Sequence, residues 1–212
     1  MFFKPGQHKE MGLRYSPLKA LIAPRPIGWI STLSKEGVAN LAPYSFFNGV
    51  SELPPMVMFA SAPDRRDDNV HGQKDSLANI LETGGFGVNI VSAALANQMM
   101  ESSKPLPAER DEFKAAGLTK KQGEIVDIPL VAEAPAHLEC RYYSHITLPD
   151  YQTGDGTIQG TVMVIGEIVG IHIDPAFIED GRVDVTKYQP VARLGYGDYA
   201  MVSDLFEMWH SG

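Results

Sequence analysis

The chain has 212 residues, of which 44% are hydrophobic and 21% are charged, and its formal net charge at pH 7 is -8. This composition is typical of a folded globular protein and argues against intrinsic disorder as the main state. The acidic balance argues against nucleic acid and against an anionic membrane as partners, because both bind basic surfaces.

Strands dominate the predicted structure. Six segments alternate apolar and polar residues and are rich in β-branched or aromatic side chains, as half-buried strands are. The loop between the first two segments is short and ends in Gly37, so these strands are expected to form an antiparallel hairpin. Six strands with short connections favour a β-barrel. The expected strands cover residues 27–34, 38–47, 55–61, 86–92, 137–148 and 160–173.

Helical signals are fewer. Residues 75–85 carry leucine and isoleucine at helical spacing, with Asp75 or Ser76 as the expected N-cap and Gly84 as the C-terminal stop. Shorter helices are expected within residues 93–102 and 109–117.

The remaining features concern organisation and location. The polar segment 62–72 is expected to be an exposed loop, and no repeat or long linker divides the chain, so we expect one domain over residues 1–212. The single cysteine, Cys140, fits a reducing compartment and is interpreted as a buried core residue. No apolar run approaches the roughly 20 residues of a spanning helix, and a signal peptide is not expected. The predicted location is the cytoplasm, without membrane contact.

Motifs for several common chemistries are missing. The chain has no G-x-S-x-G nucleophile motif and no histidine pair at metal-ligand spacing. The glycines of ETGGFGVN and YQTGDGTIQG do not follow the phosphate-loop or dinucleotide-binding patterns. We therefore predict no catalytic side chain and no metal site.

Polar side chains near strand ends in the first 80 residues suit an anionic ligand that accepts hydrogen bonds. Pro24 and Pro26 fix the backbone on either side of Arg25, which favours a bound partner for this cation. Two simpler interpretations remain open: residues 74–76 as an ordinary helix start, and Trp29 as a core residue. The polar set comprises Arg25, Ser31, Thr32, Asn40, Ser45, Asn48, Ser61, Lys74 and Ser76.

Five motifs, taken in order, resemble the flavin reductase-like family of FMN-binding split barrels. They are RPIGWIST, NLAPYSFFNGVSELPPMVMFA, KDSLANI, GGFGVNIVS and PVARLGYGDYAMV, and the similarity runs from about residue 14 to residue 202. RPIGW and NLAPYS resemble the branch that includes flavoredoxin-like proteins and the reductase components of flavin-dependent monooxygenases.

The resemblance implies a mainly β fold: a six-stranded antiparallel split β-barrel with Greek-key connections and a few short helices. It also implies a homodimer with one FMN per subunit near the dimer interface. The implied activity is that of an oxidoreductase, a flavin reductase that takes a hydride from NADH or NADPH and passes electrons to free flavin, a monooxygenase or another acceptor.

The resemblance also implies which residues lie near the cofactor. Trp29 would lie near the isoalloxazine, Ser31 and Thr32 near the ribityl chain or phosphate, and residues 74–76 near the phosphate. Arg25 would meet the FMN phosphate, a nicotinamide nucleotide phosphate or the second subunit, and these alternatives stay open. Pro43 removes a ladder donor from its strand, as expected at a sheet edge or a bulge where a ligand replaces the neighbouring strand. The expected cofactor-binding residues are Arg25, Gly28, Trp29, Ser31, Thr32, Asn40, Ala42, Pro43, Tyr44, Ser45, Ser61, Lys74, Asp75 and Ser76.

One motif departs from the family pattern. Many flavin reductases carry G-D-H before the last long strand, and its histidine is associated with the nicotinamide, whereas this chain has TGDGTIQG there. His145 and His172 are the alternative candidates. Dependence on a nicotinamide is therefore less firmly implied than FMN binding. The competing functions are a non-enzymatic, flavoredoxin-like electron carrier and a split barrel of the pyridoxamine-phosphate-oxidase type.

Overall fold

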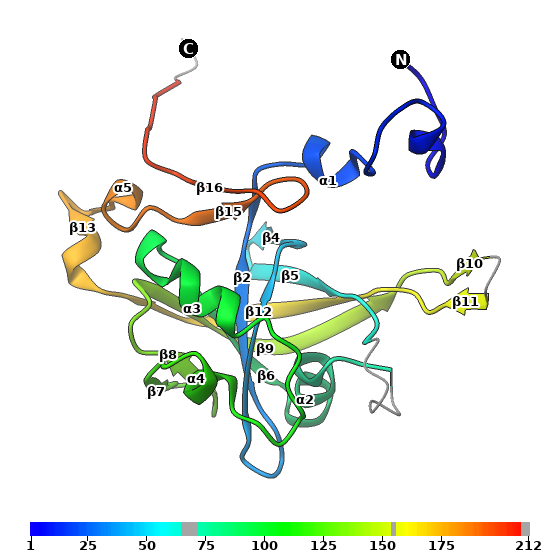
Figure 1. Cartoon of the computed structure of the whole chain (residues 1–212). Coiled ribbons are helices and arrows are strands. Elements are labelled where there is room, and N and C mark those ends of the chain that lie inside the picture. Colours follow the sequence, from blue (N-terminus) through cyan, green and yellow to red (C-terminus); the bar gives the residue numbers. More distant parts are fainter. Residues whose placement is uncertain (65–71, 154–155, 209–212) are drawn as a thin grey trace.

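The computed structural model describes residues 1–64, 72–153 and 156–208. Seven strands form one antiparallel sheet in the order β3-β2-β6-β9-β12-β5-β4 (Figure 1). The predicted fold class, mainly β with few helices, is confirmed. The seven strands are β2 (Gly28–Leu33), β3 (Ala39–Tyr44), β4 (Phe47–Glu52), β5 (Pro55–Ser61), β6 (Gly85–Asn89), β9 (Ala136–Thr147) and β12 (Val162–Ile173).

All six expected strands are present, and β2 pairs with β3 as the predicted antiparallel hairpin. The seventh strand, β4, was not predicted. One strand was expected over 38–47, but β3 ends at Tyr44, the chain turns, and β4 begins at Phe47. The sheet curls at this turn. The backbone N–H of Ala60 donates to the Phe46 carbonyl at 2.8 Å, and the Tyr44 and Phe59 ring centroids lie 4.7 Å apart. The edge of the sheet at β3 therefore approaches β5, as in a split barrel.

Smaller antiparallel sheets lie around the main sheet (Figure 1). A three-stranded one, in the order β1-β15-β16, joins the beginning of the barrel to the C-terminal part of the chain; it consists of β1 (Arg25–Pro26), β15 (Val191–Arg193) and β16 (Tyr199–Met201). The two-stranded ones are β7 (Lys120–Gln122) with β8 (Pro129–Val131), β10 (Tyr151–Thr153) with β11 (Gly156–Ile158), and β13 (Ile178–Glu179) with β14 (Arg182–Val183).

The longest helix in the described residues is α2 (Asp75–Thr83), and it starts one or two residues earlier than expected. Its N-cap is Lys74 in an extended conformation, so the prediction of Asp75 or Ser76 as N-cap was wrong: both lie inside the helix. Gly84 ends the helix with φ 76°, as predicted. The other helices are α1 (Leu18–Leu21), α3 (Ala96–Glu101), α4 (Glu112–Ala115) and α5 (Val185–Tyr188), with 3-10 turns at η1 (Gln7–Lys9), η2 (Ala93–Leu95) and η3 (Pro175–Phe177).

Strand β2 lies at the centre of the packing because both of its faces are buried. Trp29 belongs to a cluster with Met99 and Phe113, next to α3 and α4, whereas Ile30 belongs to a second cluster with Ile80 of α2. Successive side chains of a strand point to opposite faces, so β2 separates the two clusters. Cys140 is a buried free thiol in the second cluster, as predicted.

Two further findings concern the part of the chain that the structure describes. No helix there is both long and apolar enough to cross a membrane. No group of three or more His, Cys, Asp or Glu side chains is arranged to hold a metal ion. The loop predicted over 62–72 lies mostly outside the described residues, since 65–71 are not described.

Candidate functional site

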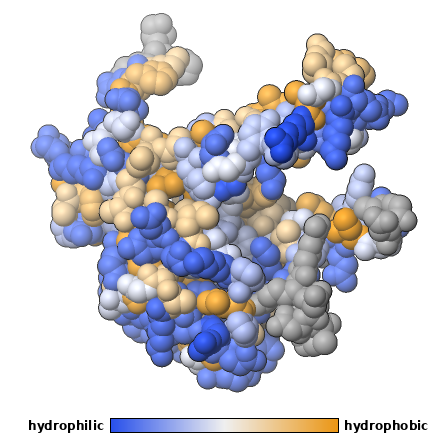
Figure 2. Space-filling model, viewed as in Figure 1, coloured by the Kyte–Doolittle hydropathy of each residue, from blue (hydrophilic) through white to orange (hydrophobic). Residues whose placement is uncertain are grey.

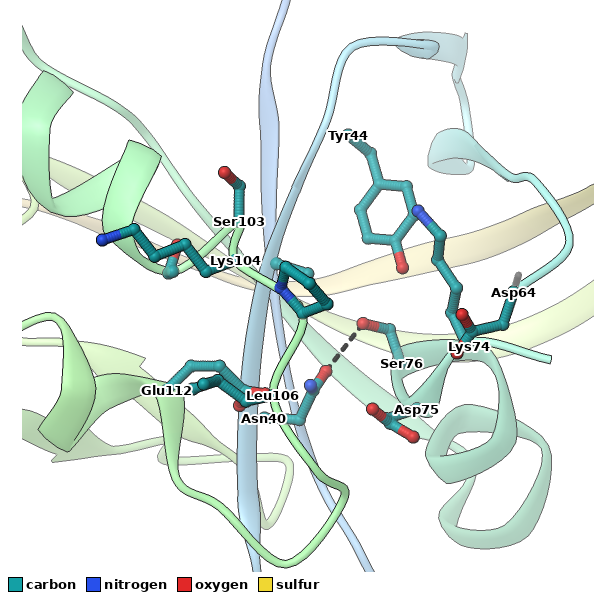
Figure 3. A pocket seen from close by; sticks show the side chains of 13 residues that line it. Asn40, Tyr44, Asp64, Lys74, Asp75, Ser76, Ser103, Lys104, Leu106 and Glu112 are labelled. Atoms are coloured by element: carbon teal, nitrogen blue, oxygen red, sulfur yellow. Dashed lines mark hydrogen bonds between the residues drawn. The ribbon is translucent and has the colours of Figure 1, made fainter. Parts of the chain in front are cut away.

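A cavity of about 130 Å³ lies beside β3, which is an edge strand of the sheet, as Pro43 predicted (Figure 3). Residues of β3 that point to one face form one wall, and the start of α2 forms another. The segment that follows α3 covers the cavity. The lining residues are Asn40, Ala42, Tyr44, Asp64, Lys74, Asp75, Ser76, Ser102, Ser103, Lys104, Pro105, Leu106 and Glu112.

The N-terminus of α2 faces this cavity. No side chain caps the helix there, and the Lys74 ammonium lies 5.4 Å from the centre of the Tyr44 ring. Ser76 donates its hydroxyl hydrogen to Asn40 Oδ1 at 2.7 Å, which ties the first turn of the helix to β3. A helix N-terminus carries partial positive charge and N–H donors that favour anions. Together with Lys74, it makes this wall suited to a phosphate.

Two buried hydroxyls nearby lack a well-formed hydrogen bond. Burial raises the pKa of Tyr44 to about 12, although the nearby hydroxyls of Ser76 and Ser61 lower it, so the phenol is neutral at pH 7. Among the described residues, neither Tyr44 Oη nor Ser61 Oγ has a partner with hydrogen-bonding geometry. Buried polar atoms normally have partners, and each orphan calls for an explanation. A ligand in the first cavity that accepts hydrogen bonds would be a partner for the Tyr44 hydroxyl, which lines it.

Glu112 closes the opposite wall of the cavity. Its Oε2 accepts a hydrogen bond from the backbone N–H of Leu41 at 3.2 Å, on the side of β3 that has no neighbouring strand. Burial raises the pKa of this carboxyl to about 7, although the hydrogen bonds from Leu41 and Asn40 lower it. Glu112 therefore titrates near neutral pH inside the candidate site.

A second cavity, of about 190 Å³, adjoins the first, and Ser103 lines both. Pro43 contributes to it from the opposite face of β3, and Ser45 contributes from the turn that follows this strand. Arg25 lines it as well, with its guanidinium held by backbone carbonyls: Nη1 donates to Lys19 and Ile22, and Nη2 donates to Leu194 at 2.8 Å. Its lining residues are Lys19, Arg25, Ile27, Pro43, Ser45, Met99, Ser103, Arg193 and Tyr199.

The structure thus brings nine of the fourteen predicted residues to the two adjoining cavities. Ser61 lines a third cavity of about 280 Å³ beyond the start of α2. The residues at these three places are Asn40, Ala42, Tyr44, Lys74, Asp75 and Ser76 in the first cavity, Arg25, Pro43 and Ser45 in the second, and Ser61 in the third.

The four predicted residues on β2 line none of these cavities. Trp29 is 0% exposed, and its indole N–H donates to Ser102 Oγ at 2.9 Å. Ser31 and Thr32 are equally buried and accept hydrogen bonds from Asn89 and Asn79 at 3.1 and 3.0 Å. A Cβ at Gly28 would lie 2.5 Å from the Phe47 ring, so this glycine makes room for a core side chain. These four residues belong to β2, the strand that pairs with β3, and they do not line the candidate site.

Several lining residues were not predicted. Glu112 lay in an expected helix, and residues 102–106 followed another, but their sequence carries no sign that they pack on β3. Arg193 and Tyr199 fall within PVARLGYGDYAMV, one of the motifs that carried the family resemblance. This C-terminal motif could therefore have indicated that Arg193 and Tyr199 lie at the site.

Comparison with known proteins gives a family match and several similar structures. Residues 21–187 match the model of the flavin reductase like domain. An uncharacterized protein from Aquifex aeolicus is 36% identical over 85% of this chain and 86% of its own length. Nitrilotriacetate monooxygenase component B from Bacillus cereus has a similar structure, with TM-score 0.85 and 30% identity over 98% of both chains. A 2-nitrobenzoate 2-nitroreductase from Pseudomonas fluorescens gives TM-score 0.81 and 29% identity over 99% of this chain and 96% of its own.

The raised pKa of Glu112 predicts how stability depends on pH. Because the folded protein holds this proton more tightly than the unfolded chain does, the free energy of unfolding falls as pH rises from about 4.5 to about 7. Glu112→Gln keeps an oxygen for the Leu41 N–H and removes the titration. We expect the melting temperature of the variant minus that of the unmodified protein to increase as the pH is raised from 5 to 8. Glu109→Gln, at an exposed position, is the control, and parallel curves for all three proteins would contradict the assignment.

Proposed function

The chain belongs to the flavin reductase-like family, and from this premise we propose that it is an FMN-binding flavin reductase that takes electrons from NADH or NADPH. Electrons would pass to free flavin or to a partner such as a monooxygenase. The observation that carries the proposal is the first cavity, where Lys74 and the uncapped N-terminus of α2 lie beside the buried hydroxyl of Tyr44, which has no well-formed hydrogen-bond partner among the described residues. The proposed location is the cytoplasm, in keeping with a single, buried, free cysteine.

The residues of the first cavity fit a flavin mononucleotide. Lys74 and the first turn of α2 would hold the phosphate, and the open edge of β3 offers backbone groups to the rest of the cofactor. Lys104 lines the same cavity, and its ammonium pairs with Glu101 at 2.5 Å, which leaves Lys74 as the cation proposed for the phosphate. Bound flavin would supply the hydride and electron transfer that amino-acid side chains cannot perform. The chain's own part would be to orient the cofactor and exclude water.

The size of the first cavity supports a second subunit. About 130 Å³ is well below the roughly 300 Å³ at which small-molecule pockets begin, so one chain would enclose only part of the cofactor. Large apolar side chains are exposed on the elements around β1: Leu21 is 79% exposed, Leu53 is 90% exposed and Phe206 is 84% exposed. Figure 1 shows that α1 and the C-terminal segment lie at the upper end of the molecule, above β4, and Figure 2 shows hydrophobic residues along both terminal segments.

Exposed apolar surface of this kind usually marks an interface. A second copy of the chain is the proposed occupant. Dimerisation would then cover both the open part of the cofactor site and the apolar terminal segments.

Purified protein should be yellow, and heating it should release FMN. Steady-state oxidation of NADH and NADPH by the FMN-loaded protein, followed at 340 nm with excess free flavin as acceptor, tests the reductase activity. Turnover with either nicotinamide supports the proposal. A yellow protein that neither nicotinamide reduces, but that a reduced protein partner does reduce, would identify an electron carrier instead. A colourless protein whose melting temperature ignores FMN would contradict flavin binding itself.

The phosphate assignment predicts a selective effect at Lys74. A charge-assisted hydrogen bond contributes about 1.5–3 kcal/mol, so Lys74→Gln should weaken FMN binding about tenfold or more. Riboflavin, which has no phosphate, should bind the variant as well as it binds the unmodified protein. Fluorescence titration of the apo-protein measures both affinities. The control is Lys35→Gln, which removes an exposed lysine 3.6 Å from Glu82 on another part of the chain. Equal losses for the two flavins would place the phosphate elsewhere.

The dimer predicts an effect of charge on the apolar surface. Leu21→Asp combined with Leu53→Asp should give a monomer by light scattering at micromolar concentration, whereas the unmodified protein should be a dimer. The monomeric variant should also bind FMN more weakly than the dimer, because no partner covers its cofactor site. Leu81→Asp, on the solvent side of α2, is the matched control and should remain a dimer. A monomeric unmodified protein that binds FMN tightly would overturn the proposed assembly.

A further inference from the structure

The second cavity carries an unusual charge for so acidic a protein. Three cations line it, each from a different segment: Lys19 from α1, Arg25 from β1 and Arg193 from β15. None of its lining residues is a carboxylate, although the whole chain has a net charge of -8. The first cavity, by contrast, mixes lysines with carboxylates.

Arg25 places an uncompensated charge at this cavity. The residue is 5% exposed, and its guanidinium donates to three backbone carbonyls, but it has no carboxylate partner among the described residues. Its buried Nε has no hydrogen-bond partner there either. A buried charge without a counter-ion is costly, and an anion nearby would reduce that cost.

Arg193 is oriented by its neighbours. Its guanidinium carbon lies 4.3 Å from the centre of the Tyr199 ring, and Nη2 donates to the Tyr196 carbonyl at 2.5 Å. A guanidinium has five N–H donors in a planar fork that matches an oxyanion, so one such bond leaves donors for a ligand. Ser45 and Ser103 add hydroxyls to the same lining.

The position of the cavity relates it to the candidate flavin site. Ser103 lines both cavities, and residues of the β3 edge alternate between them: Ala42 and Tyr44 face the first, whereas Pro43 faces the second. Its volume of about 190 Å³ is below the roughly 300 Å³ at which small-molecule pockets begin, so it suits one charged end of a larger molecule rather than the whole of it. A molecule bound there would lie next to the cofactor.

We propose that the second cavity binds the oxyanion of the second substrate, with Arg193 and Lys19 as the specificity-determining residues and Arg25 as a fixed cation behind them. This proposal rests on the proposed function, because it takes the first cavity to be the flavin site. The shared chemistry is an oxyanion, which has two sources: a phosphate of a nicotinamide nucleotide, or the carboxylate of a small organic electron acceptor.

The test measures anion binding directly. FMN-loaded protein is titrated with inorganic pyrophosphate and, separately, with benzoate, by calorimetry. Binding should weaken about tenfold in Arg193→Gln and be restored in Arg193→Lys, which keeps the charge. Arg182→Gln, which removes an 81% exposed arginine elsewhere on the chain, should bind like the unmodified protein. Tighter binding of pyrophosphate identifies a nucleotide phosphate as the natural group, and tighter binding of benzoate identifies a carboxylate.

Apo-protein separates this proposal from the proposed function. There, Lys74→Gln should leave the Arg193-dependent binding intact, so the second cavity is tested even if the protein binds no flavin. Equal weakening in Arg193→Gln and Arg182→Gln would reduce the effect to overall charge and overturn the proposal. Loss of anion binding when FMN is loaded would mean that the flavin itself fills the second cavity, which also overturns it. Absence of binding to either form of the protein is the third contrary result.

Discussion

The open edge of β3 is the constraint on which the candidate site depends. An edge strand presents unpaired N–H and C=O groups, and this one manages them in two ways. Pro43 has no N–H to leave unpaired, and the N–H of Leu41 donates to the carboxyl of Glu112. The remaining edge stays available to a ligand. Because alternate side chains of a strand point to opposite faces, the same edge gives rise to two cavities that meet at Ser103.

Strand β2 supports this edge from behind. It pairs with β3 along its whole length, and its own side chains are buried on both faces, so it cannot shift without disturbing both core clusters. The bond from Trp29 to Ser102 connects β2 to the segment that covers the first cavity. Thr32 and Asn79 likewise connect β2 to α2, whose N-terminus is the proposed phosphate wall. The residues of β2 are thus bonded to the elements that line the first cavity and do not line it themselves.

The sequence predicted most of the sheet because local alternation and burial agree along its strands. Strand β4 escaped prediction because FNGVSE is polar and almost wholly exposed, and only its pairing with β5 makes it a strand. The site was predictable to the extent that its residues lie on β3 and at the start of α2. Glu112 and residues 102–106 reach the site through tertiary packing, which no local pattern encodes. The prolines around Arg25 favoured an extended backbone, and Arg25 lies in the short strand β1, but one of the carbonyls that hold its guanidinium belongs to Leu194, 169 residues away.

The charges of the two cavities give them different roles. A phosphate in the first cavity would meet Lys74 together with Glu112, whose carboxyl titrates near pH 7, so protonation of Glu112 would change the electrostatic field that the phosphate experiences. In the second cavity no lining residue is a carboxylate, and the Arg25 guanidinium is held by main-chain carbonyls. The proposed cofactor would therefore bind among cations and carboxylates, and the proposed second substrate would bind among cations alone, on opposite faces of β3.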